Sequence, residues 1–188
     1  MSNTLEKVLV VDIEATCWEN ENEKPRGETN DIIEVGVALV DLRGFRIEES
    51  KGIIVKPERS KISPFCQKLT TITQAQVDKG TAFKDACHQL RSHFRSKDLT
   101  WISWGDYDRK QFERQSREMS VDYPFGPRHL NLKNLFGVLH GLPKEIGMDK
   151  ALDMLNIQLQ GIHHRGVWDA INISEILINT MKKFRGIK

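Results

Sequence analysis

Two acidic residues near the start of the chain have the spacing of a metal-binding pair. Asp12 and Glu14 follow the unbroken apolar run Val8–Val11, whose valines favour a buried strand. Side chains two positions apart on a strand point to the same face, so the two carboxylates would repel each other. A hard divalent cation such as Mg²⁺ or Mn²⁺ between them would relieve that repulsion. Taken alone, the short Asp-x-Glu pattern is more typical of a strand-ending acid beside a solvated loop acid.

A second pair of acids follows the apolar segment Trp101–Trp104, at a predicted junction between a strand and a helix. Such junctions lie at a sheet edge, where functional sites form. Asp106 comes directly after the strand and its glycine, so we expect its carboxylate to accept backbone amide bonds as the helix N-cap. Asp108 has Phe112 four residues further on, which places it on the inward face of the helix. Asp108 is therefore the candidate functional acid of this pair.

A third acid lies close to a histidine near the end of the chain. On a helix expected from Trp168 to Phe184, Asp169 shares a face with Ile173 and Ile176, which must pack on the sheet. A carboxylate at the head of a buried stripe needs a polar partner. His164 precedes it by five residues, on an expected loop. The pairing indicates a functional role for His164 in preference to a place on the polar surface.

Hydrophobic patterns predict the elements that position these side chains. Apolar runs predict strands that begin at Val8 and span Ile32–Val40, Arg46–Val55, Leu99–Trp104 and Leu130–Leu132. Periodic patterns and caps predict helices from Pro64, from Thr73 to Val77, over Phe83–Phe94, Asp106–Met119, Leu132–His140 and Met148–Leu155, and the final one from Trp168. The first three strands have short connections and should be antiparallel neighbours. Strands then alternate with helices, which indicates an α/β fold with a mixed sheet.

The motifs around these acids resemble those of the DEDDh 3′→5′ exonucleases of the RNase H-like superfamily, and within them the Eri-type RNA exonucleases. The matching segments, in chain order, are VVDIEATCW, IIEVGVALVD, ISPFCQKLTTITQAQVD, GDYDRKQF and HRGVWDA. Several motifs in the family's order are far more specific than any one of them. The resemblance implies an RNase H-like exonuclease fold, with a central mixed five-stranded sheet flanked by helices. Thr71 and Trp168 depart from the family pattern, which often has Gly and Asp at these positions.

The same resemblance implies a chemistry and a set of site residues. It implies hydrolysis with two divalent cations, Mg²⁺ or Mn²⁺, and places the metal ligands at Asp12, Glu14, Asp108 and Asp169. His164 would be the general base, since its ordinary pKa of about 6.5 suits proton transfer near neutral pH. Substrate contacts would come from Ala15, Thr16, Phe65, Leu69 and Thr73. For Leu69, a place in the helix core is an equally good interpretation.

The implied substrate is a single-stranded RNA or DNA with a free 3′ end, with RNA favoured and nucleoside 5′-monophosphates released. Arg165, Lys68 and Arg109 could meet phosphates, although a solvated surface role is the better interpretation for each. A DNA proofreading-type exonuclease that acts with a polymerase is one alternative. A non-catalytic nucleic-acid-binding domain is another, but it would predict a missing acid, and all are present. A structural protein with coincidental acids is disfavoured by the ordered motifs.

Length and composition limit the class of protein to which the chain can belong. The 188 residues are 39% hydrophobic and 29% charged, so we expect one globular domain, and the resemblance implies that it is a single exonuclease domain over residues 1–188. The sequence lacks an apolar run near the ~20 residues of a transmembrane helix, and its start lacks a secretory signal pattern, so no membrane partner is expected. Three cysteines without CxxC spacing indicate reduced thiols in a cytoplasmic protein. The net charge of +2 is compatible with nucleic acid binding, and no protein partner is indicated.

Overall fold

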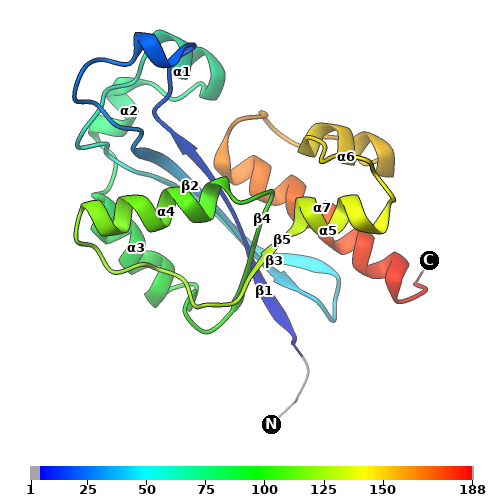
Figure 1. Ribbon diagram of the computed structural model, residues 1–188. Helices are drawn as coiled ribbons and strands as arrows, with labels where there is room; N and C mark the ends of the chain where they lie inside the picture. The colour runs from blue at the N-terminus through cyan, green and yellow to red at the C-terminus, as the bar shows by residue number, and fades with distance from the viewer. Residues whose placement is uncertain (1–4, 188) are drawn as a thin grey trace.

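The computed structural model describes residues 5–187, which form a five-stranded sheet with helices on both faces (Figure 1). The strands are β1 (Lys7–Ala15), β2 (Ile32–Asp41), β3 (Arg46–Ile54), β4 (Thr100–Ser103) and β5 (His129–Asn131). Their order across the sheet is β3-β2-β1-β4-β5. The pairs β1–β2 and β2–β3 are antiparallel, and the pairs β1–β4 and β4–β5 are parallel. The mixed five-stranded sheet predicted from the sequence is confirmed.

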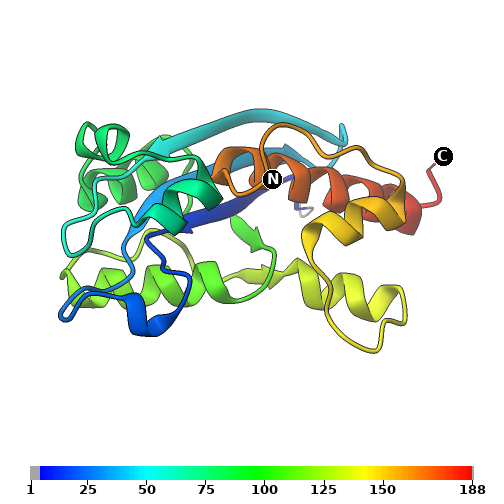
Figure 2. The ribbon, with the colours of Figure 1, turned by 90° about the horizontal axis from the view of Figure 1, so that it is seen from above.

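Seven α-helices connect and cover the strands of the described chain. They are α1 (Pro64–Thr70), α2 (Gln74–Asp78), α3 (Phe83–Ser92), α4 (Tyr107–Glu118), α5 (Leu132–Leu139), α6 (Met148–Leu155) and α7 (Gly166–Phe184). A short 3-10 turn, η1 (Glu21–Glu23), was not predicted. In Figure 2, η1 and α1 lie in one half of the molecule and the C-terminal end of α7 lies in the other. None of the helices within residues 5–187 has the length and apolar character needed to cross a bilayer.

The alternation of β1 divides the core into two layers and sets the direction of the acids. Val8 and Val10 pack in the layer that contains α5, α6 and α7. Leu9 and Val11 pack in the opposite layer, which contains α3 and α4. Both faces of β1 are therefore buried, as the unbroken apolar run predicted. Because side chains alternate, Asp12 continues the series of Val8 and Val10 and faces the α7 layer.

The helix starts follow the predicted caps with small shifts. Ser63 accepts a bond from the Cys66 amide at the start of α1, and Thr73 forms a capping box at the start of α2. The predicted start of the last helix at Trp168 is two residues late, since α7 begins at Gly166. The predicted strand Leu130–Leu132 is displaced by one residue, because the Asn131 side chain caps α5 and ends β5 there.

Thr71 ends α1 in the left-handed region, with φ 62°. This region costs a residue with a Cβ about 1–2 kcal/mol, and glycine adopts it freely. Glycine also makes the unfolded chain more flexible, which costs about 0.4–1 kcal/mol. We therefore expect Thr71→Gly to raise the free energy of unfolding by roughly 0.5–1 kcal/mol in urea titrations. Thr71→Ala keeps the Cβ and should give little gain; an equal gain from both would show that backbone strain is not the cause.

Candidate active site

Acidic side chains from three elements meet at the end of β1. Asp12 and Glu14 lie on β1 and Asp169 lies in the first turn of α7, and one oxygen of each lies within 4.8 Å of the others. Asp108, at the start of α4, lines the same cavity of about 300 Å³. Glu14, Asp108 and Asp169 are only 8%, 4% and 5% exposed. The structure thus brings together all four acids that the motifs singled out.

Asp108 and not Asp106 faces this cavity, as predicted. The Asp108 Oδ1 accepts a bond of 3.0 Å from the Ile13 amide, which ties α4 to β1 between the two strand acids. Asp106 occupies the N-cap position, but its side chain makes no capping bond, so that part of the prediction is wrong. Its backbone is helical (φ −105°, ψ −3°) and not extended like that of a capping residue. Its carboxylate instead lies 3.3 Å from Arg109.

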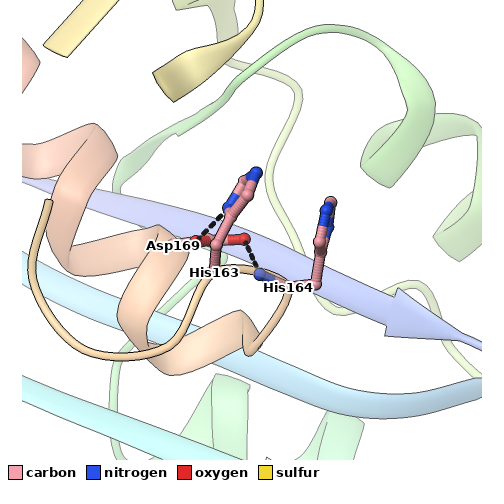
Figure 3. A group of neighbouring side chains, drawn as sticks. All are labelled: His163, His164 and Asp169. Carbon is pink, nitrogen blue, oxygen red and sulfur yellow. Dashed lines mark hydrogen bonds and ion pairs between the residues drawn. The ribbon is translucent and has the colours of Figure 1, made fainter. Parts of the chain in front are cut away.

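Two adjacent histidines contact the Asp169 carboxylate. They lie in a tight turn, residues 163–166, which we call the histidine turn. The His163 Nδ1 lies 3.1 Å from Asp169 Oδ1, and the His164 amide donates to Asp169 Oδ2 over 3.0 Å. Figure 3 shows the two rings side by side, with centroids 3.9 Å apart, and Asp169 at their base. The contact of His163 was missed by the sequence reasoning, although two consecutive histidines before an inward acid were a usable signal.

The packing of these groups shifts their pKa values. Burial, reinforced by the neighbouring carboxylates, raises the pKa of Glu14 to about 9 and raises the pKa of Asp12 well above its ordinary value. Burial raises the pKa of Asp108 to about 7, against the opposing effect of the Ile13 amide. Burial also raises the pKa of Asp169, although the contact with His163 opposes this. Such a cluster of hard oxygen donors disfavours its own ionised form, so it fits a divalent cation.

His164 has the opposite shift. Its pKa is lowered, first by burial and then by the adjacent His163, while Asp169 partly offsets both effects. A histidine with a lowered pKa is neutral at neutral pH, and a neutral ring can accept a proton. His164 also has a left-handed backbone, with φ 62°. The ring therefore lines the acidic cavity in the protonation state that a general base requires.

None of the five proposed substrate residues is among the residues that line this cavity. Phe65 is half-buried and lines a different cavity of about 610 Å³ beside Trp18. Thr16 is fully buried, and its hydroxyl bonds the Ser60 hydroxyl at 2.6 Å and the Asp31 amide at 2.9 Å. The Thr16 side chain is therefore committed to the fold.

The other three predicted substrate residues lie on α1, at the start of α2 and at the end of β1. Leu69 is half-buried on α1, and Thr73 uses its side chain in the capping box of α2. Ala15 is buried at the end of β1, where its carbonyl oxygen lies 3.7 Å from the Cys66 Sγ. Helix α1 thus packs against the end of the strand that carries Asp12 and Glu14. The substrate role of these residues stays a prediction.

Tyr107 is a cavity residue that the sequence reasoning passed over. It is the first residue of α4, it is 56% exposed, and it lines the cavity beside Asp108 and Trp104. An exposed aromatic ring of this kind is a surface on which a nucleobase can stack. The signal was present in GDYDRKQF, where an aromatic residue directly precedes Asp108.

Two of the candidate phosphate-binding cations have partners within the protein. Arg165 forms an ion pair with the buried Glu34, at 2.9 Å from Nε to Oε2. Arg109 lies near Asp106 and Glu113, at 3.3 Å and 3.4 Å. Lys68 is exposed on α1 and lines the cavity of Phe65. No arginine is among the residues that line the cavity of the four acids.

Comparisons with known proteins point to one family. The exonuclease family model (RNase_T) matches residues 9–177. The rat 3′-5′ exoribonuclease 1 is 29% identical over 185 residues, which cover 93% of this chain and 53% of the rat protein. The probable 3′-5′ exonuclease KapD of Bacillus subtilis is 27% identical over 169 residues, which cover 89% of this chain and 81% of that protein. The chain thus spans about half the length of the exoribonuclease 1 relatives that it matches.

A solved structure gives the same answer for the fold. The nuclease domain of 3′hExo, a DEDDh family member bound to rAMP, superposes with a TM-score of 0.87 at 26% identity. The match covers 100% of this chain and 98% of that domain. The resemblance of the motifs to DEDDh exonucleases and the RNase H-like exonuclease fold are both confirmed.

Proposed function

The chain belongs to the exonuclease (RNase_T) family, and from this premise we propose that it is a metal-dependent 3′→5′ exonuclease. Its substrate is single-stranded nucleic acid with a free 3′ end, RNA in preference to DNA, and its products are nucleoside 5′-monophosphates. One observation carries the proposal: Asp12, Glu14, Asp108 and Asp169 line one cavity together with His164. Residues 1–188 act in this proposal as one catalytic domain, since the family match spans both core layers.

The four acids are the proposed ligands of two divalent cations, Mg²⁺ or Mn²⁺. Bound cations of this kind would lower the pKa of an attacking water and stabilise negative charge on the phosphate. Asp12, Glu14 and Asp169 offer oxygens on one side, and Asp108 offers its second oxygen while Oδ1 accepts from the Ile13 amide. The raised pKa values of these carboxyl groups support the proposal, because a nearby cation favours their charged form.

His164 is the proposed general base, and its replacement gives the first functional prediction. We expect His164→Ala to lower the single-turnover rate by roughly 10²–10⁴-fold, because the change removes the proposed proton acceptor. Metal-induced stabilisation should be kept, since the four acids remain. His163→Ala should reduce the rate much less, because His163 is not the proposed base and its recorded contact is with the Asp169 carboxylate. Equal losses of rate in the two variants would show that His164 is not the specific general base.

The preference for RNA rests on the relatives, and the site adds a surface that could hold the terminal base. The rat relative is named an exoribonuclease, and the solved nuclease domain of 3′hExo holds rAMP. In this chain Tyr107 offers an exposed ring beside Asp108 for the terminal base. Stacking tolerates any base, so we propose that Tyr107 grips the terminal nucleotide without selecting its sequence.

A polarity experiment tests the function. Matched RNA and DNA oligomers with a 5′ label are incubated with Mn²⁺ and the products are resolved by length. We expect stepwise shortening from the 3′ end, faster on RNA, and a block by a 3′-terminal phosphate, because the site must grip a free 3′ end. Faster digestion of DNA would favour the proofreading type. Binding without shortening would indicate a non-catalytic domain, and digestion of circular strands would refute exonuclease action.

A further inference from the structure

Glu34 is a buried carboxylate beside the active site that the proposed chemistry does not use. It lies on β2, directly opposite Glu14 in the antiparallel register, and it is 1% exposed. Residues directly opposite in such a pair share a face of the sheet, so Glu34 points to the same side as Glu14. Its charge contributes to the raised pKa of both Asp12 and Glu14. A further buried acid in this place needs a reason, because it adds repulsion to the cluster.

The contacts of Glu34 give that reason. Its Oε2 accepts from the Arg165 Nε at 2.9 Å and from the Gly166 amide at 3.0 Å, and its Oε1 lies 3.3 Å from the second Arg165 nitrogen. Both oxygens of Glu34 therefore accept bonds from this turn, and Glu34 is not among the residues that line the cavity of the four acids. Both donors belong to the two residues that directly follow His164. A charged, partly planar pairing of this kind fixes the direction of the arginine as well as its position.

The turn that donates these bonds has an unfavourable backbone. His164 lies in the left-handed region, with φ 62°, which persists in a residue with a side chain only when the surroundings fix it. Arg165 is the N-cap of α7, but its side chain makes no capping bond. Two carboxylates supply the missing restraint: Asp169 takes the His164 amide and Glu34 takes the Gly166 amide. A Cβ on Gly36 would lie 1.9 Å from the Gly166 carbonyl, so the turn rests directly on β2.

We propose that Glu34 and Arg165 are positioning residues that hold the histidine turn so that the His164 ring faces the acids. The inference rests on the proposed function, in which His164 is the base. It also gives Arg165 a role other than phosphate binding. The competing explanation is an ordinary buried ion pair that contributes to stability alone, and the two explanations differ in what happens when His164 is already absent.

A double-mutant cycle separates them. Arg165→Met is measured with 5′-labelled RNA and Mn²⁺, alone and combined with His164→Ala. We expect Arg165→Met alone to lower kcat by roughly 10²-fold with little change in KM, since a displaced catalytic group costs rate more than binding. In the His164→Ala background the same change should alter kcat by less than about three-fold, because residues that act through one group are not additive. Equal losses in both backgrounds would overturn the inference.

A matched control shows whether lost stability is the cause. Arg59 forms a comparable ion pair with the buried Asp31, with side-chain exposures of 26% and 0% against 21% and 1% for Arg165 and Glu34. Arg59→Met should lower the melting temperature by a similar amount while kcat stays within about three-fold of the wild type. A kcat loss in Arg59→Met equal to that in Arg165→Met would assign the effect to stability.

Hydrogen exchange tests the turn without using activity. In Arg165→Met and Glu34→Gln, the His164 and Gly166 amides should exchange faster, whereas the β1 amides should keep their protection. Unchanged exchange at both amides would overturn the inference even in an active enzyme. If the wild type fails to shorten any oligomer while the turn loosens as expected, the proposed function fails and the structural role of Glu34 stands.

Discussion

EDTA is expected to abolish hydrolysis by this protein completely, and Mg²⁺ or Mn²⁺ to restore it. The cavity offers carboxylates and two histidines, but no arginine or lysine among its lining residues, so nothing in it neutralises a phosphate without a cation. Ca²⁺ should bind the same oxygens and support turnover poorly, because it is larger and tolerates looser geometry. The measurement is the rate of shortening of a 5′-labelled RNA with each ion after dialysis. Robust hydrolysis in EDTA would refute the metal-dependent mechanism.

The stability of the folded chain at different pH values gives a second test of metal binding. The folded chain keeps protons on Asp108 up to a pKa of about 7 and on Glu14 up to a pKa of about 9, whereas the unfolded chain releases them near the ordinary values. The stabilising contribution of these two carboxyl groups in EDTA should therefore be largest below their ordinary pKa values and should fall as the pH rises from there, through about 7 for Asp108 and about 9 for Glu14. Added Mn²⁺ should raise the melting temperature more at the upper end of this range, where ionised carboxylates bind it without losing protons. A melting temperature indifferent to Mn²⁺ at every pH would contradict the site.

The sequence predicted the parts of this site that depend on local periodicity. Alternation along β1 was enough to place Asp12 and Glu14 on one face, and the spacing to Phe112 was enough to turn Asp108 inward. The Asp106 cap failed because capping depends on the backbone angles of one residue, which composition does not determine. The Glu34–Arg165 pair joins residues 131 positions apart, so no local pattern could indicate it. The resemblance to a family assigned His164, but only the structure places His163 on Asp169.

Asp108→Asn is expected to nearly abolish hydrolysis while the folded structure is kept. Asparagine retains a side-chain oxygen that can accept the Ile13 amide bond, which is 3.0 Å long in the native chain. It removes the negative charge that a divalent cation needs, so metal affinity and rate should fall together. Because burial raises the pKa of Asp108 to about 7, ionised Asp108 is costly at higher pH. The free energy of unfolding of Asp108→Asn in EDTA should thus be unchanged or slightly higher than that of the wild type.

Asp106→Ala is the matched control, two residues away on the same helix start. Its carboxylate is 39% exposed and lies 3.3 Å from Arg109, without a capping bond. A solvent-exposed pair of this kind contributes about 0.2–1 kcal/mol, so the loss of stability should stay within that range and catalysis should be mostly retained. Initial rates and urea titrations on the two variants decide the assignment. An inactive, stable Asp106→Ala beside an active Asp108→Asn would show that the metal-binding acid of this helix is Asp106, because only a ligand loses activity without losing the fold.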